Sequence, residues 1–325
     1  MHSVTYAQAI NEGLREEMRR DPNVVVLGED VGKYGGVFGV TRGLYDEFGE
    51  ARVRDCPLNE AAIIGFGIGL AVAGKPTVAE LEFMDFVTFC MDAITNQAPK
   101  LRYFWGGQVQ VPLVIRAPIA SNLGFGSQHS QSLEGWFMHV PGLKVAMPAT
   151  AHDAKGLIKT AIRDPNPVLF ADSIALYGTK ADIPDEEYLV PFGQAAVRRE
   201  GDDVTVVALG AMVPQALKAA DELAGLGTEA EVIDPRTLAP LDIDTILASV
   251  EKTGRLVVAH QAHRTGGAGA EIAQQVTERA FDSLDGPVVR VAAQDVPVPA
   301  SAALEKAVFP DVADIVRACQ SFRRR

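Results

Sequence analysis

The sequence predicts an α/β protein of two domains, each a largely parallel sheet flanked by helices. Short apolar runs rich in β-branched residues alternate with helical patterns along the chain, which is typical of strand–helix units. The apolar runs are continuous, as expected of parallel strands that are covered on both faces. The chain has 325 residues, and at roughly 100–200 residues per domain it should form about two domains.

The first predicted domain covers residues 1–185. Its first helix places Ile10, Leu14 and Met18 on one face, and a buried strand follows at 24–27. A Gly- and Ala-rich helical segment then covers residues 60–73. The other strand candidates are 77–79, 113–115, 143–145 and 168–170.

Residues 178–200 interrupt this alternation. They begin with the stretch GTKADIPDEEYLVPFG, rich in charge, Pro and Gly, and we predict a linker at 186–199. The second predicted domain covers residues 200–325. Its strand candidates are 204–209, 231–233, 256–259 and 288–291, separated by helices near 212–226, 242–251 and 268–282.

Composition narrows the classes of partner. A formal net charge of −12 argues against nucleic acid or an anionic membrane as the main partner. No run approaches the ~20 apolar residues of a membrane-spanning helix, and the N-terminus shows no signal or transit pattern. The three cysteines form no CxxC and suggest no disulfide framework. We therefore expect a cytoplasmic protein.

Glu60 stands at the start of an otherwise uncharged apolar helix within PLNEAAIIGFGIGLAVAG (57–74). The glycines of this segment follow a GxGxG spacing inside the helix, which argues against a nicotinamide-binding Rossmann fingerprint and favours close helix packing. Glu60 is either a favourable charge at a helix N-terminus or a buried acid that holds its proton, a signature of functional sites. The segment alone does not decide between them.

His129 lies in a Gly-, Ser- and Gln-rich loop just before a helical segment. Loops that follow parallel strands often hold the catalysts of α/β proteins. A lone loop histidine is nevertheless more often a surface residue. His139 and His152 have weaker contexts, and we interpret them as structural.

Three carboxylates flank three phenylalanines in ELEFMDFVTF (80–89). The aromatic residues predict either one stripe of a helical core or a stacking platform for a flat heterocycle. Paired carboxylates also occur in glycoside hydrolases, but nothing else here resembles a sugar site. The sequence has no P-loop, serine-hydrolase elbow or zinc-ligand spacing, and no GDG followed by an asparagine to hold Mg²⁺ and a diphosphate.

Together these segments resemble the β subunit of the decarboxylating component of 2-oxo acid dehydrogenase complexes, a family of transketolase-like thiamine enzymes. The resemblance covers nearly the whole chain, in matching order and spacing. It implies a transketolase-like pyrimidine-binding domain followed by a transketolase C-terminal-like domain. Its motifs are VVLGEDVGKYGGVFGVTRGL (25–44), the Glu60 segment, KLRYFWGGQ (100–108), QHSQSLEGWFMHVPGLKV (128–145), DAKGLIKTAIRDPNPVLF (153–170), EVIDPRTLAPLDIDTIL (231–247) and HRTGGAGAEI (263–272).

The resemblance implies a role for each matching residue. Glu60 would hydrogen-bond the aminopyrimidine ring of thiamine diphosphate and promote the tautomer that activates the thiazolium. Phe86 would stack on that ring, and His129 would handle protons during acyl transfer to a lipoyl group. The remaining residues lining the cofactor pocket would be Glu29, Leu58, Asn59 and Glu82.

The resemblance also implies a structural K⁺ site, formed largely by backbone carbonyls. Its residues would be Leu113, Ala161, Ile162, Asp164 and Asn166. The alternative interpretation is a plain helix-ending turn at RDPNP.

In the two-chain members of this family an α subunit carries the Mg²⁺–diphosphate motif that this sequence lacks. The resemblance therefore implies a shared active site in a heterotetramer with two copies of each chain, and Mg²⁺ ligands from the α subunit. It also implies that the C-terminal domain docks a lipoyl-bearing acyltransferase core.

The sequence departs from the family pattern at Gln261 and His263, at Ala171–Ser173 and across the loop 117–127, which leads to His129. We interpret the first departure as bearing on subunit contacts and the last as bearing on substrate choice. The leading hypothesis is a pyruvate dehydrogenase β subunit acting on a small 2-oxo acid. The alternatives are an acetoin or branched-chain 2-oxo acid dehydrogenase β subunit, a split transketolase, and a non-catalytic assembly subunit.

Overall fold

The computed structural model describes residues 1–324 and divides the chain into two compact units. The first unit consists of residues 1–120 and 137–192, and the second of residues 121–136 and 193 onward. Each unit is a largely parallel sheet with helices packed on it, which confirms the predicted α/β class. The break after residue 192 falls within the stretch 186–199 that the sequence marks as a linker.

In the first unit the strands follow the order β6-β7-β5-β4-β2-β3, and every neighbouring pair is parallel. These strands are β2 (Val25–Gly28), β3 (Val53–Asp55), β4 (Thr77–Glu80), β5 (Leu113–Arg116), β6 (Lys144–Ala146) and β7 (Val168–Phe170). A small antiparallel ribbon of β1 (His2–Thr5) and β8 (Lys180–Ile183) accompanies the sheet. The sequence did not predict this ribbon, because its strands are short and only partly buried.

The helices of this unit are α1 (Tyr6–Arg20), α2 (Leu44–Phe48), α3 (Glu60–Val72), α4 (Leu101–Phe104) and α6 (Ala151–Arg163), and α5 (Glu134–Met138) begins in the segment of the second unit. The unit also has two 3₁₀ segments, η1 (Met84–Cys90) and η3 (Ile174–Leu176), and one π-helical segment, η2 (Ala93–Gln97). A capping box between Thr5 and Gln8 starts α1. Its predicted apolar face is buried, and α1 packs on α6.

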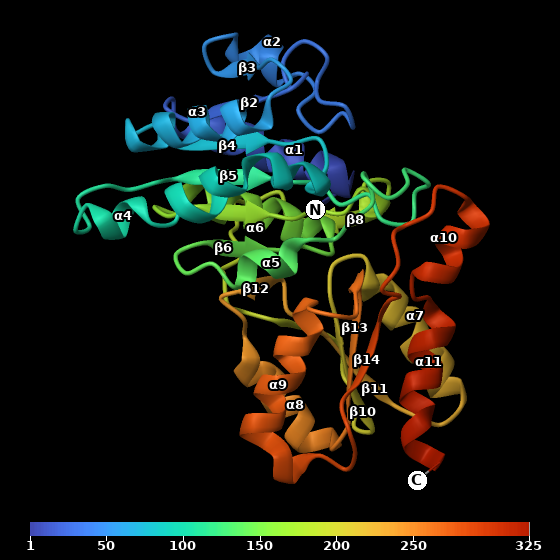
Figure 1. Cartoon of the computed structure of the whole chain (residues 1–325). Coiled ribbons are helices and arrows are strands. Elements are labelled where there is room, and N and C mark those ends of the chain that lie inside the picture. Colours follow the sequence, from blue (N-terminus) through green and yellow to red (C-terminus); the bar gives the residue numbers. More distant parts are fainter. Residues whose placement is uncertain (325) are drawn as a thin grey trace. The chain divides into compact units, whose positions relative to one another are not determined.

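In the second unit the strands follow the order β14-β13-β10-β11-β9 (Figure 1). They are β9 (Ala196–Arg199), β10 (Val204–Ala208), β11 (Ala230–Asp234), β13 (Leu256–His263) and β14 (Val289–Ala293), and the short β12 (Thr237–Ala239) follows β11. Only β9, at the edge, runs antiparallel to its neighbour. It occupies the end of the predicted linker, so ordered structure begins earlier than the sequence pattern suggests.

Helices cover both faces of this second sheet. In Figure 1, α8 (Ile243–Thr253) and α9 (Ala268–Ala280) lie on one side of the strands, and α7 (Met212–Gly225) and α11 (Val312–Gln320) on the other. The chain also forms α10 (Ala302–Val308), η4 (Phe281–Ser283) and η5 (Ser321–Arg324). Across residues 1–324, no helix has the length and apolar character needed to cross a membrane.

Residues 121–136 group with the second unit, although the sequence places them in the first domain. The cause is a set of buried contacts: Glu134 forms an ion pair with His260 of β13, and the Gly124 N–H donates to Glu305 of α10. Such tertiary contacts leave no trace in the local pattern of the sequence.

Candidate active site

Two predicted site residues follow neighbouring parallel strands of the first unit. Glu29 comes directly after β2, and Glu82 comes two residues after β4. Because β2 and β4 are parallel neighbours, these residues meet at the carboxyl edge of the sheet, where open α/β sheets bind ligands. One carboxylate oxygen from each of Glu29, Asp30 and Glu82 lies within 4.8 Å of the others. The structure therefore brings Glu29 and Glu82 together, with Asp30 as a third acid.

Burial raises the pKa of Glu82 to about 7, and the negative charges of Glu29 and Asp30 add to the effect. Burial also raises the pKa of Glu29, and the charges of Asp30 and Glu60 act in the same direction. Like charges that are crowded and partly desolvated favour the protonated form of one member. Near neutral pH this edge of the sheet can therefore hold a proton on Glu82.

Glu60 is the first residue of α3 and is half-buried. Asn59 caps the helix, since its Oδ1 accepts a hydrogen bond from the Ala62 N–H at 3.0 Å. The charge of Glu60 acts on Glu29 and Glu82, and on the Cys90 thiol, whose pKa burial raises to about 12. Glu60 thus belongs to the same acidic group, at a helix N-terminus that favours negative charge. The interpretation as a charge at a helix N-terminus agrees with this position, and the interpretation as a buried catalytic acid stays a prediction.

The aromatic residues that follow β4 divide by burial. Phe83 is buried, and Phe86 is half-buried with its ring centroid 5.6 Å from that of Phe83 in an edge-to-face contact. Phe89 is 66% exposed. Phe83 is therefore a core residue, whereas Phe86 is only half-buried and its stacking role stays a prediction. Leu58, just before α3, is exposed.

A buried ionic cluster lies beside this edge, and the sequence analysis missed it. Arg116, the last residue of β5, forms an ion pair with Glu80 and places its Nη2 2.8 Å from Asp172 Oδ2. The Tyr177 hydroxyl donates to the same Asp172 oxygen at 2.5 Å. Asp172 belongs to the stretch that departs from the family pattern, and this departure was the one available signal. The cluster anchors the end of β4, two residues before Glu82.

The segment that carries His129 lies in the second unit. His129 is half-buried, and its N–H donates to the Gly126 carbonyl at 3.4 Å. The Ser121 hydroxyl donates to the Ser130 carbonyl at 3.0 Å, which closes the segment on itself. Gly124 and Gly126 have φ angles of +79° and +78°, in the left-handed region that favours glycine. The loop is thus a compact structure, and His129 lies next to the hydrogen bond that closes it.

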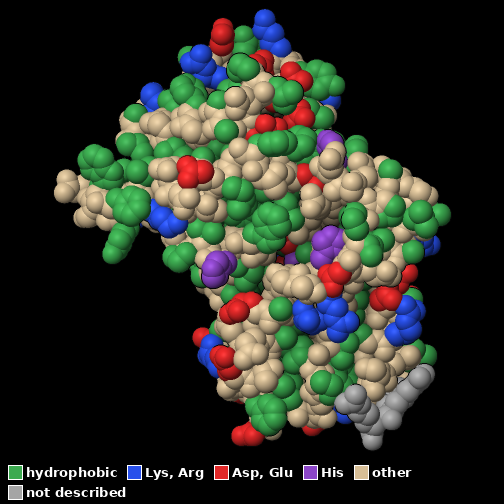
Figure 2. Space-filling model, in the orientation of Figure 1, with side chains coloured by type: hydrophobic (Ala, Val, Ile, Leu, Met, Phe, Trp, Pro, Cys, Tyr) green, Lys and Arg blue, Asp and Glu red, His purple; other side chains and the backbone are tan. Residues whose placement is uncertain are grey.

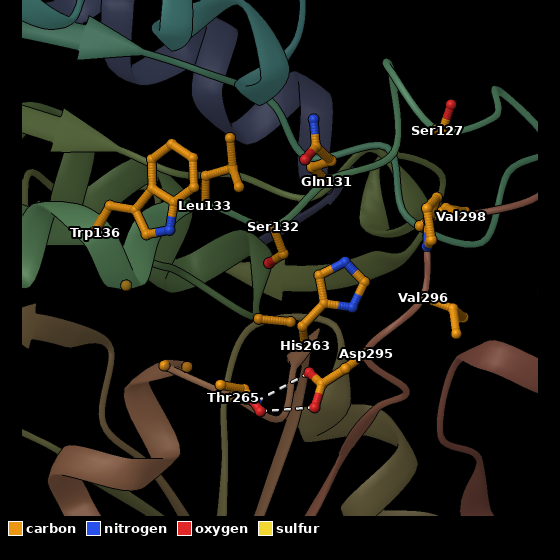
Figure 3. Close-up of a pocket in the computed structure, with 15 residues that line it drawn as sticks. Ser127, Gln131, Ser132, Leu133, Trp136, His263, Thr265, Asp295, Val296 and Val298 are labelled. Carbon is orange, nitrogen blue, oxygen red and sulfur yellow. Dashed lines mark hydrogen bonds between the residues drawn. The ribbon is translucent and has the colours of Figure 1, made fainter.

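This segment borders a cavity of about 440 Å³ (Figure 3). Gln131, Ser132 and Trp136 line it from the segment, and His263 lines it from the end of β13. His263 Nδ1 lies 2.7 Å from the Gln294 carbonyl, so this nitrogen carries the proton. His263 therefore lies on a cavity that the segment carrying His129 also lines, and the bearing of this departure on subunit contacts stays a prediction.

The predicted K⁺ residues lie around the end of α6 and the start of β5. Ala161 and Ile162 belong to the last turn of α6, and the Ala161 carbonyl accepts a hydrogen bond from the Asp164 N–H at 3.3 Å. Asp164 caps the helix, and its Oδ1 accepts from the Asn166 N–H at 2.9 Å. Lys144 forms an ion pair with the Asp164 carboxylate. Carbonyl ligation of a cation and a plain helix-ending turn both fit this geometry, so the K⁺ site stays a prediction.

Comparison with known families identifies both halves of the chain. Residues 2–179 match the family model "Transketolase, pyrimidine binding domain", and residues 193–315 match "Transketolase, C-terminal domain". The acidic group, α3 and the phenylalanines all lie within the first match.

Relatives that match over nearly the whole chain are dehydrogenase and oxidoreductase β subunits. The chain is 46% identical to the pyruvate dehydrogenase E1 component subunit beta of Bacillus subtilis, over 97% of each chain. It is 45% identical to the acetoin:2,6-dichlorophenolindophenol oxidoreductase subunit beta of Cupriavidus necator, over 96% of this chain and 95% of the relative.

A solved structure described as "Split gene transketolase, inactive beta4 tetramer" superposes on this chain with a TM-score of 0.82. The match covers 98% of this chain and 97% of that one at 26% sequence identity. The predicted transketolase-like fold is confirmed.

The elevated pKa of Glu82 predicts how stability depends on pH. A carboxyl with a raised pKa in the folded protein stabilises the fold below its unfolded pKa, near 4.5, and this contribution is lost as the pH rises through about 7. The variant Glu82→Gln has no carboxyl to ionise and so does not lose this contribution. From pH 5 to pH 8 the free energy of unfolding of the variant, relative to that of the wild type, should rise by about 1–2 kcal/mol, after a discount for solvent screening.

Thermal unfolding at both pH values measures this gain, with the exposed Glu50→Gln as a control that should show none. A wild-type advantage that grows with pH would contradict the assigned proton on Glu82.

Proposed function

Because the chain belongs to the family of pyruvate and acetoin dehydrogenase E1 β subunits, we propose that it is the β subunit of a pyruvate dehydrogenase decarboxylating component. The proposed reaction is oxidative decarboxylation of a small 2-oxo acid with acyl transfer to a lipoyl group, in an active site shared with an α subunit. The observation that carries the proposal is the acidic edge formed by Glu29, Glu82 and Glu60 in the pyrimidine-binding domain.

Thiamine diphosphate fits this edge. An aminopyrimidine needs a carboxyl partner for a ring nitrogen and a flat apolar surface, and the chain offers Glu60 on α3 and the half-buried Phe86 on η1, two elements that pack together. Leu58, Asn59, Glu29 and Glu82 would line the rest of the pocket. When bound, the cofactor would supply the carbon nucleophile and the electron sink for loss of CO₂. The α subunit would supply the Mg²⁺ ligands and the diphosphate site.

His129 would serve acyl transfer as a proton donor. In that step the lipoyl S–S bond breaks, one sulfur takes the acyl group and the other takes a proton. The two electrons that reduce the disulfide come from the decarboxylated substrate. A histidine suits this role because its ordinary pKa lies near neutrality.

An α subunit would cover the apolar surface around α3, in a heterotetramer with two copies of each chain. Phe66 is 49% exposed and Phe89 66%, and a side-chain carbon added at Gly65 or Gly69 would meet no atom within 4 Å. Helix α4 and the residue that caps it add Tyr103, Phe104 and Trp105, each at least 60% exposed. Figure 2 shows apolar side chains that project from this part of the surface. Exposed apolar surface of this extent is typical of protein interfaces.

The resemblance to the family supplies two further assignments: the second domain would dock a lipoyl-bearing acyltransferase core, and K⁺ would bind at the end of α6. The composition and the sequence pattern supply two more, which are a cytoplasmic setting and the domain division at 1–185, 186–199 and 200–325. Exchange of K⁺ for Li⁺ should lower the melting temperature.

Three alternatives compete with pyruvate dehydrogenase. Acetoin-type relatives are as similar as pyruvate-type ones, so acetoin and branched-chain 2-oxo acids belong in every assay. The split transketolase is less similar, at 26% identity. A non-catalytic assembly subunit would have no need to keep Glu60, Phe86 and His129 together.

Because the proposed active site is shared between two chains, we expect decarboxylation only when this chain is mixed with its α subunit. With thiamine diphosphate and Mg²⁺, this chain and its α partner together should decarboxylate pyruvate, whereas either chain alone should not. Glu60→Gln removes the acid that activates the cofactor and should lower the rate by about 100- to 10,000-fold. The exposed Glu50→Gln serves as the control. Activity from this chain alone, or an unaffected Glu60→Gln mixture, would overturn the site assignment.

If the α subunit covers the exposed apolar face of α3, a charge placed on that face should prevent assembly of the heterotetramer. Phe66→Asp places a charge on the exposed face of α3, which the single chain tolerates and a buried interface does not. The variant should keep the melting temperature of the isolated chain but fail to form a heterotetramer in analytical ultracentrifugation. Phe281→Asp, which charges a residue of the second unit that is 68% exposed, is the matched control. Normal assembly of the Phe66 variant would rule out α3 as the contact.

A further inference from the structure

Two contacts with buried side chains of the second unit hold the segment 121–136, one before His129 in the sequence and one after it. One contact is at Gly124, five residues before His129, and the other at Glu134, five residues after it. Neither Glu305 nor His260, which make these contacts, has a role in the function proposed above.

The contact after His129 is a buried ion pair. Nε2 of His260, on β13, lies 2.6 Å from Oε1 of Glu134, and both side chains are almost completely buried. The Ser132 hydroxyl donates to the other Glu134 oxygen at 2.8 Å. Burial alone would raise the pKa of Glu134, but the charge of His260 holds it below its ordinary value.

The contact before His129 is a hydrogen bond to a buried carboxylate. Oε2 of Glu305, in the first turn of α10, accepts from the Gly124 N–H at 2.8 Å, and Glu305 is 2% exposed. A side-chain carbon added at Gly126 would meet Ala300 at 3.5 Å, so this part of the segment lies close to the chain that leads into α10.

Buried charges are poor choices for stability alone. The cost of removing two ions from water often cancels their attraction, and an apolar pair of similar volume is often as stable. Charged contacts do restrict geometry, because the attraction between close opposite charges and a hydrogen bond to a carboxylate both weaken steeply with distance. Their placement on both sides of one histidine points to a positioning role. A misplacement of about 1 Å at a reacting group can cost about 100-fold in rate.

We propose that His260 and Glu305 are positioning residues for His129, and that they hold it where it can protonate the departing lipoyl sulfur. The proposal rests on the proposed role of His129. The C-terminal domain would thereby govern acyl transfer, whereas decarboxylation would depend on the acidic edge of the first domain.

The test separates the two half-reactions in the assembled complex with the α subunit. Decarboxylation is followed with a dye as electron acceptor, and acyl transfer with free lipoamide. The variants are His260→Leu and Glu305→Leu, with His129→Gln as the reference for loss of the proton donor. The matched control is His152→Leu, which removes a histidine 3.2 Å from a carboxylate, Asp153, in the first unit.

Both leucine variants should lower acyl transfer by about 10- to 100-fold and leave decarboxylation and thiamine diphosphate affinity within about twofold. Glu305→Gln keeps an oxygen that can accept from Gly124 and should restore most of the transfer rate. If a single leucine variant unfolds, the double variant Glu134→Leu/His260→Leu, which leaves no unpaired buried charge, replaces it.

Equal losses in both half-reactions, or no loss of acyl transfer, would overturn the inference. If His129→Gln itself leaves acyl transfer intact, the proposed role of His129 fails and the positioning role fails with it. If His129→Gln shows the split and the positioning variants do not, only the positioning role fails.

Discussion

The crowding of carboxylates at one edge of the first sheet is the constraint on which the site depends. Glu29, Asp30 and Glu82 gather within a few ångströms, and the charge of Glu60 reaches them from the start of α3. Such a group cannot remain fully ionised at low cost, so it must hold a proton or take a cationic or hydrogen-bonding partner. A heterocycle that accepts a hydrogen bond from a protonated carboxyl lowers the free-energy cost of this crowding. The electrostatics of the fold therefore suit the proposed cofactor.

The fold creates this crowding through its topology. Parallel strands place their following residues at one edge, and α3 points its N-terminus, which favours negative charge, toward the same acids. Arg116 at the end of β5 forms ion pairs with Glu80 and Asp172. Because Glu80 is the last residue of β4, these ion pairs hold the end of β4 in place two residues before Glu82. Within the second unit, the buried side chains of His260 and Glu305 hold the His129 segment.

The sequence predicted the features that repeat with a period. The strand pattern and the helix expected at 60–73 agree with the sheet and with α3 at Glu60–Val72. It could not predict the grouping of 121–136, because that depends on the distant partners His260 and Glu305. Arg116 was missed for the same reason. The acids at 29, 60 and 82 were found through a family resemblance, since local pattern alone left Glu60 undecided.

Titration calorimetry shows most directly whether this chain supplies only half of a cofactor site. Thiamine diphosphate with Mg²⁺ is titrated into this chain alone, into the α partner alone, and into their mixture. Saturable binding is expected in the mixture, with one cofactor for each pair of chains, and none with this chain alone. Binding to this chain alone with the affinity of the mixture would show that the site is not shared.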